Sequence, residues 1–265
     1  MNSSPVRPVL SRRWWRPAAA VVAVACLAGL VSAAGQSPTT AVTAASAAAA
    51  PGTLAPTERH QRVVRLVSEV IERQHYRRAE LDDKLSALVY ERYLEALDGN
   101  RSYFTAADIA EFEPLRLKLD DAIRNADLQP AFTIFQRYQQ RNRELMAHAI
   151  AQLATEPDFK LDESFQFDRS DTPWPADRTE LEDLWRKRVK NDALSLMLAG
   201  KTWTEAHDVL QKRYERFVKR IDQVTADDVF EIFMNAYAHV YDPHSNYFSP
   251  RRSWRSAPSA TASPP

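Results

Sequence analysis

Glycine is scarce in this chain, which has only five glycines among 265 residues. Within the part whose composition suits a folded domain, Gly99 and Gly200 stand far apart. Phosphate-binding loops, dinucleotide-binding fingerprints and nucleophile elbows each need several glycines in close succession. The scarcity of glycine therefore excludes nucleotide-binding sites of those kinds and hydrolases that are built on such an elbow.

Cysteine is nearly absent, because Cys26 is the single one. It lies in the apolar run Ala18–Leu30, which follows a start made basic by four arginines and precedes the small residues Val31-Ser32-Ala33. This order is typical of a secretory signal peptide, so we predict one over residues 1–33 and export to the periplasm. The run is shorter than the roughly 18 residues that a membrane span needs. An uncleaved inner-membrane anchor is the alternative for the run, and a lipid is the alternative for Cys26.

A basic surplus is also absent, because 35 lysines and arginines balance 35 aspartates and glutamates. Loss of residues 1–33 would remove arginines and no acids, leaving a net charge of about −4. Proteins that bind nucleic acid carry a concentrated basic surplus. The basic clusters at 186–188 and 216–220 have acidic neighbours on the same predicted helices, which indicates solvent-facing surfaces. The charge pattern argues against nucleic acid as a partner.

The six histidines form no metal-binding pattern. No two of them have the spacing of a helical zinc site, and His239 and His244 lie on either side of a predicted helix end. The members of a Ser–His–Asp triad meet only in space, so the sequence identifies none. We predict no catalytic residue, no metal and no small-molecule cofactor for this chain.

Hydrophobic periodicity between residues 57 and 251 is helical. Apolar residues recur at spacings of three and four along six stretches, which is the period of one buried helix face. These positions are Val63, Leu66, Val67, Val70 and Ile71; Leu85, Leu88, Val89 and Leu97; Phe132, Phe135, Tyr138, Leu145 and Ile150; Leu181, Trp185, Val189 and Leu196; Ala206, Leu210, Tyr214, Phe217 and Ile221; and Val229, Phe230, Phe233, Tyr237 and Val240. The pattern predicts an all-α fold, an irregular domain of about six to nine helices.

Helix starts are indicated by threonines that are followed three residues later by an acid, the spacing of a capping box. The pairs are Thr105–Asp108, Thr179–Glu182, Thr202–Glu205 and Thr225–Asp228. Pro130 suits the first turn of a further helix. Pro114 should split or kink the helical region around it. Residues 158–178, in which two prolines flank Trp174, are predicted to be a long irregular connection.

Two segments lack the apolar side chains that a core needs. Residues 34–56 contain almost only Ala, Ser, Thr, Pro and Gly, which predicts a disordered linker. The tail of residues 252–265 has a similar composition and is also predicted to be disordered. Between them, residues 57–251 are enough for one domain with a hydrophobic core.

The stretch YDPHSNYFSP at residues 241–250 follows the last predicted helix and combines aromatic, acidic, histidine and proline residues. From these residues alone it suits a catalytic loop, a metal site, a domain boundary or a turn that ends a helix. Its aromatics Tyr241, Tyr247 and Phe248 either pack onto the core or form a ligand surface, and the same alternatives hold for Trp174.

Four stretches resemble the amino-terminal helical domain of the tail-specific, or carboxy-terminal processing, proteases. DPHSNYFSP at 242–250 resembles the segment that closes that domain, ahead of the PDZ module and the protease core. FDRSDTPWP at 167–175, LWRKRVKNDALSLMLAGK at 184–201 and RHQRVVRLVSEVIERQHYRRAELDDKLS at 59–86 occur in the family's order. The resemblance covers residues 57–251.

The resemblance implies a protein partner, either a substrate polypeptide or a lipoprotein adaptor. It also implies a domain hinge or interface formed by Asp242, Pro243, His244, Tyr247, Phe248 and Pro250. The family uses a serine nucleophile with a lysine base, and no serine or lysine here matches those motifs. After Arg251 the chain departs from the family pattern. We therefore expect a truncated amino-terminal domain without hydrolytic activity, and the alternative is a self-standing exported binding module.

The hinge interpretation carries an expectation about exposure. If the family's chain turns towards its protease core here, Tyr241, Tyr247 and Phe248 should belong to an exposed apolar patch or a loosened loop. Trp174 is expected to anchor its loop on the helical core.

Overall fold

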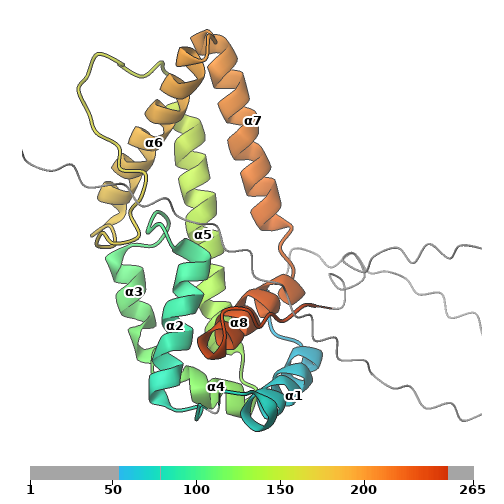
Figure 1. The fold of residues 1–265 in the computed structure, drawn as a ribbon. Coiled ribbons are helices and arrows are strands. Elements are labelled where there is room, and N and C mark those ends of the chain that lie inside the picture. Colours follow the sequence, from blue (N-terminus) through green and yellow to red (C-terminus); the bar gives the residue numbers. More distant parts are fainter. Residues whose placement is uncertain (1–53, 78, 250–265) are drawn as a thin grey trace, which may run out of the picture. The chain divides into compact units, whose positions relative to one another are not determined.

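The computed structural model describes residues 54–77 and 79–249 (Figure 1). Every regular element within these residues is a helix, so the predicted all-α class is confirmed. The elements are α1 (Glu58–Gln74), α2 (Asp83–Asp98), α3 (Ala106–Phe112), η1 (Glu113–Leu115), α4 (Leu119–Asn125), α5 (Gln129–Gln152), α6 (Arg178–Leu198), α7 (Trp203–Asp222) and α8 (Ala226–Tyr241). The predicted signal peptide, most of the linker and the tail lie outside the described residues. None of the described helices is long and apolar enough to cross a bilayer.

Three of the four predicted capping boxes are confirmed. Thr105, Thr202 and Thr225 cap α3, α7 and α8, and in each case the acid three residues on returns a hydrogen bond. The fourth prediction is wrong, because α6 starts earlier and is capped by Asp177. The Asp177 carboxylate accepts from the backbone N–H of Glu180 at 2.9 Å. An aspartate side chain caps a helix as well as a threonine side chain does. Asp177 comes two residues before Thr179 and has an extended backbone, so α6 begins directly after Asp177.

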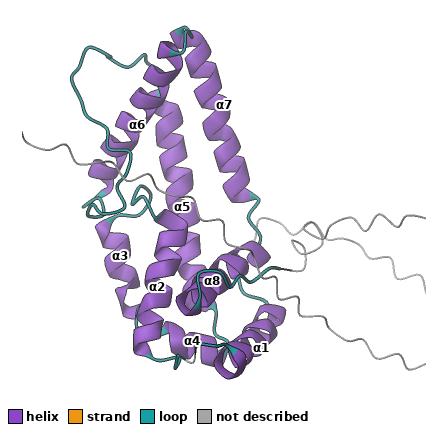
Figure 2. Cartoon of the chain, viewed as in Figure 1, coloured by secondary structure: helices purple, strands orange, loops and turns teal. Residues whose placement is uncertain are grey.

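Helix α5 takes part in two hydrophobic clusters, one towards each of its ends. Its first half, through Phe132 and Phe135, joins the cluster that α1, α2, α4 and α8 form. Its second half, through Leu145, packs with Trp185 of α6 and Leu210 of α7. Figure 2 shows the long α5 running from one group of helices to the other. Helix α8 lies in the first cluster and packs mainly against α2.

The buried face of α1 is narrower than the apolar pattern predicted. His60, Val64 and Ser68 face the core, whereas Leu66 is 63% exposed and Val70 is exposed as well. The predicted core position Leu88 of α2 is also exposed. Periodicity gives the direction of an apolar stripe but not the part of it that neighbouring helices cover, so these three assignments are wrong.

The connection between α5 and α6, residues 153–177, has no regular structure. It is fixed to the start of α3 by a hydrogen bond of 2.8 Å from the Ala106 N–H to the Pro175 carbonyl. Trp174 is half-buried there, with its ring 6.1 Å from that of Phe104. The Arg101 guanidinium lies 5.4 Å from the Trp174 ring centre. This geometry supports the expectation that Trp174 anchors the loop, and the role itself stays a prediction.

Candidate functional site

Residues 242–249, here called the strap, leave the end of α8 and run back along the same helix. The helix ends at Tyr241 because the residue before Pro243 is disfavoured in the helical conformation, and Asp242 is extended. The Asp242 carboxylate accepts from the His244 N–H at 3.1 Å, and its carbonyl accepts from the Ser245 N–H at 3.0 Å. This short turn reverses the chain.

Three polar residues of α8 hold the strap, and they are spaced by one helical turn each. Asn235 donates to the Tyr247 carbonyl at 3.1 Å and accepts from the Tyr247 N–H at 2.7 Å. Glu231 accepts from the Ser249 N–H at 3.2 Å. His239 Nε2 lies 2.9 Å from the Asn246 side-chain oxygen. The pairing order shows that the strap runs antiparallel to α8.

The strap alternates in burial, as an extended segment does. Tyr247 packs edge-on against Phe230, with ring centres 5.3 Å apart, and burial raises the pKa of its hydroxyl. Ser249 is buried. Phe248 lies between these two anchored residues and is 57% exposed. The exposed apolar residue at this end of the domain is thus held in place by its neighbours.

Tyr241 does not belong to an exposed patch, so that expectation is wrong for this residue. Its side chain is fully buried, and its ring packs edge-on against Tyr237 at 5.5 Å and against His75 at 5.5 Å. Its hydroxyl donates to the Ala79 carbonyl at 3.4 Å. Tyr241 is the last residue of α8, and it faces the segment that follows α1.

Beside the strap, a groove of about 450 Å³ lies between α2 and α8. It is lined by Arg92, Glu95 and Ala96 from α2, by Ile232, Asn235, Ala236 and His239 from α8, and by Pro243 of the strap. Arg92 and Glu95 pair with each other at 2.8 Å on the rim. Asn235 and His239 thus serve twice, since they hold the strap and line the groove.

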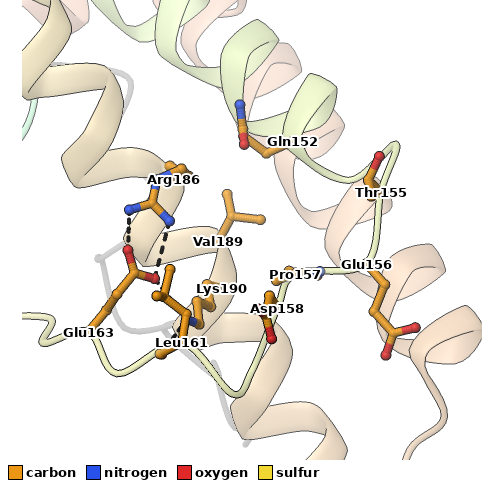
Figure 3. Close-up of a pocket in the computed structure, with 10 residues that line it drawn as sticks. All are labelled: Gln152, Thr155, Glu156, Pro157, Asp158, Leu161, Glu163, Arg186, Val189 and Lys190. Carbon is orange, nitrogen blue, oxygen red and sulfur yellow. Dashed lines mark hydrogen bonds and ion pairs between the residues drawn. The ribbon is translucent and has the colours of Figure 1, made fainter.

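A second depression, of about 240 Å³, lies where the α5–α6 connection meets α6 (Figure 3). Here Glu163 pairs with Arg186 and, at 2.7 Å, with Lys190. Hydrogen bonds from Arg186 and Lys190 lower the pKa of Glu163 to about 2. Because these charges are already paired with one another, we assign the cluster a structural role in holding the connection on α6.

The α8 row of Glu231, Asn235 and His239 was not predicted from the sequence. A signal for it exists, because apart from the two tyrosines these three are the only polar residues of α8 after its first turn, and they recur every four residues. The pair of His60 with Asp227 was also missed, with the His60 Nε2 2.8 Å from the carboxylate. That pair joins the starts of α1 and α8. Within the described part of the chain, no group of three or more His, Cys, Asp or Glu residues can hold a metal ion.

Comparison with known proteins identifies a family for this chain. A model of the tail specific protease N-terminal domain matches residues 67–251. A tail-specific protease from Haemophilus influenzae is 35% identical over 196 residues, which cover 74% of this chain and 28% of that relative. The chain thus spans less than a third of the length of this relative. Pro250 lies outside the described residues, and the described part of the strap ends close to the end of the family match.

Proposed function

Because this chain belongs to the tail-specific protease family and carries its amino-terminal domain, we propose that it binds polypeptide and does not cleave it. The groove between α2 and α8 is the binding site in this proposal. The observation that carries it is that Asn235 and His239 line the groove and already bind an extended segment, the chain's own strap.

The lining of the groove suits an extended chain. Ile232 and Ala236 offer an apolar floor, and Arg92, Glu95 and His239 offer donors and acceptors along the rim. Ligand sites commonly combine an apolar surface with a few polar groups that fix orientation.

The absence of cleavage is supported by the surroundings of the serine hydroxyls. A Ser/Lys mechanism needs a lysine amine next to the nucleophilic hydroxyl. In the residues that the structure describes, the hydrogen-bonded serine hydroxyls bind backbone carbonyls, backbone N–H groups or the side chains of Asn100, Asp168 and Asp242, and none binds a lysine.

The partner in this proposal is a substrate polypeptide or a lipoprotein adaptor, and the place of action is the periplasm. The predicted signal peptide over residues 1–33 and the family support export. A self-standing exported module that binds a protein is the alternative, and it would use the same groove. The two differ in the ligand, since an adaptor presents a folded surface and a substrate presents an unstructured chain.

Fluorescence anisotropy tests this function. A fluorescein-labelled unstructured polypeptide with an apolar carboxyl terminus is titrated with the protein, and its mass is measured afterwards. We expect anisotropy to rise while the mass stays intact. Ala96→Arg fills the groove and should weaken binding at least about tenfold. Ala107→Arg, at an exposed alanine of α3 outside the groove, is the matched control and should change nothing.

Two outcomes contradict the proposal. Peptide fragments that appear in proportion to pure protein would show that the chain hydrolyses polypeptide. Equal binding by the Ala96→Arg and Ala107→Arg variants, or no binding by the unsubstituted chain, would remove the groove as the site.

A further inference from the structure

Four helices of the described chain begin with a capping box, and the box of α1 differs from the other three in its chemistry. In α3, α7 and α8 the third helical residue is an acid, and its carboxylate accepts from the backbone N–H of the capping threonine. In α1 the residue at this place is His60, and its ring nitrogen Nδ1 accepts from the Thr57 N–H at 3.2 Å. Among these four boxes, the box of α1 alone depends on an imidazole.

The contacts of His60 fix the state of its ring. The Thr57 N–H can only donate, so Nδ1 carries a lone pair and no proton. A neutral imidazole then has its hydrogen on Nε2, which lies 2.8 Å from Asp227 Oδ1 and donates to it. The ring is buried and stacks on Phe230 at a centre-to-centre distance of 4.6 Å. The arrangement therefore requires a neutral ring in one defined tautomer.

A second proton on this ring can bind only at Nδ1, because Nε2 already carries a hydrogen. The Nδ1–H and the Thr57 N–H would then be two donors that face each other, so the hydrogen bond of the cap is lost. The Asp227 carboxylate still accepts from Nε2–H, and a hydrogen bond from a charged donor is stronger than one from a neutral donor. Protonation of His60 thus breaks its contact with Thr57 and keeps its contact with α8.

The ionisable groups around the ring come from three elements. Asp227 belongs to α8, and Arg59 of α1 lies 3.9 Å from the same carboxylate. Burial, and after it the charges of Arg59 and Asp227, set the pKa of the Tyr247 hydroxyl, so this group of the strap also faces the pair. Helix α5 contributes the ring of Phe132, 6.2 Å from the imidazole. Asp227 favours a charged imidazole, whereas Arg59 and the N–H of the capping threonine oppose it.

We propose that His60 is an acid-sensitive switch at the point where the chain enters the domain. When the ring gains its second proton, Thr57 loses its partner and residues 54–57 loosen, while α1 stays attached to α8 through Asp227. Leu54 lies on α5, because its carbonyl accepts from the Gln136 side chain at 2.6 Å. The switch is independent of the proposed polypeptide binding, because neither residue of the His60–Asp227 pair lines the α2–α8 groove.

Nuclear magnetic resonance tests the switch on the unsubstituted chain. Long-range correlation of the ring protons and nitrogens should show His60 neutral with its proton on Nε2 at pH 7.5, and protonated on both nitrogens at pH 5.0. The protection factor of the Thr57 amide against hydrogen exchange should fall at least about tenfold between these pH values. The Thr225 amide is the internal control, because its acceptor is the Asp228 carboxylate, and its protection should change less than about twofold.

Three results of this experiment would overturn the proposal. They are a neutral ring with its proton on Nδ1 at pH 7.5, a ring that is still neutral at pH 5.0, and equal protection of the Thr57 amide at the two pH values.

Glutamine at position 60 tests whether the imidazole itself causes the response. In His60→Gln the amide oxygen can accept from the Thr57 N–H and the amide nitrogen can donate to Asp227, and glutamine suits this place in a capping box. It gains no proton, so the difference in Thr57 protection between pH 5.0 and pH 7.5 should disappear. His207→Gln is the matched control, because His207 lies on α7, 3.1 Å from an aspartate but outside the capping box.

A second variant does not change the buried ring. Asp227→Asn removes the carboxylate that favours a charged imidazole, so the loss of Thr57 protection should require a lower pH than in the unsubstituted chain. An unchanged response in His60→Gln, a response that is lost in His207→Gln, or one that moves to higher pH in Asp227→Asn would show that another group controls the start of α1.

Discussion

The side-chain amide of Asn235 satisfies both backbone hydrogen-bonding groups of Tyr247. Its oxygen accepts from the Tyr247 N–H at 2.7 Å, and its nitrogen donates to the Tyr247 carbonyl at 3.1 Å. A neighbouring β-strand would offer the same donor and acceptor pair. The Asn235 side chain therefore makes the two hydrogen bonds that a neighbouring strand would make, and it fixes which residue of the strap lies against this position of α8.

Asn235→Ala should release the strap while the helices stay folded. Two hydrogen bonds are lost, so the free energy of unfolding should fall by about 1–3 kcal/mol. Amide hydrogen exchange should become faster at residues 246–249 and stay unchanged in α2. Asn191→Ala is the control, because Asn191 is a half-exposed helical asparagine that makes no side-chain hydrogen bond within the described chain. Unchanged exchange in the strap would show that Asn235 does not hold it.

Truncation of the two neighbouring aromatics of the strap should reduce stability by very different amounts. Tyr247→Ala removes a ring that packs on Phe230 and should lower the free energy of unfolding by about 1–3 kcal/mol. Phe248→Ala removes an exposed ring and should change it by less than about 0.5 kcal/mol. Urea denaturation of both variants measures the difference. If Phe248→Ala is the more damaging of the two, the described alternation of the strap is wrong.

Asp98 should make stability depend on pH above the usual carboxylate range. Burial raises its pKa to about 6, although the N–H groups of Ser102, Tyr103 and Phe104 donate to it. A folded pKa above the unfolded value of 3.8 means that the contribution is full below pH 3.8 and is lost as the pH rises through about 6. Asp98→Asn should therefore destabilise the chain more at pH 4.5 than at pH 7.5.

Urea denaturation of the unsubstituted chain and of Asp98→Asn at both pH values measures this dependence. The converse order, with the larger loss at pH 7.5, would mean that the three N–H donors outweigh burial and favour the ionised carboxylate.

Asp108 should show the opposite dependence on pH. Burial works against its ionisation, but hydrogen bonds from Arg141, Thr105 and Arg137 outweigh burial and lower its pKa to about 2. Its contribution is present above the unfolded pKa of 3.8 and is lost as the pH falls through about 2. Asp108→Asn leaves two arginines without their shared partner and should lower the free energy of unfolding by about 3 kcal/mol at pH 7. The loss should shrink between pH 4 and pH 2 in denaturation experiments, and a loss independent of pH would contradict the assignment.

The helices could be predicted because hydrophobic periodicity and helix capping both depend on residues that lie close together in the sequence. Thr105, Thr202 and Thr225 each stand next to the turn they close, so their spacing to an acid was enough. The prediction that Thr179 caps α6 was wrong because Asp177, two residues earlier, caps a helix equally well. The exposure of Leu66 could not be derived, since it depends on how far the neighbouring helices α4 and α8 cover α1.

The candidate site was predictable only in part. The family resemblance located the segment around Tyr247 and Phe248, but it did not separate the two residues. Their separation arises from Asn235 and Glu231, whose spacing on α8 was visible in the sequence. The groove depends on the approach of α2 to α8, and Ala96 has no local signal that places it there.

Hydrogen–deuterium exchange with and without bound polypeptide tests the central claim most directly. The labelled unstructured polypeptide is added to saturation, and exchange is measured by mass spectrometry along the whole chain. The account predicts slower exchange in the strap, residues 242–249, and at the facing ends of α2 and α8, with an intact polypeptide at the end. Protection confined to α6 and α7, or a cleaved polypeptide, would contradict the claim that this domain binds polypeptide in the α2–α8 groove without hydrolysing it.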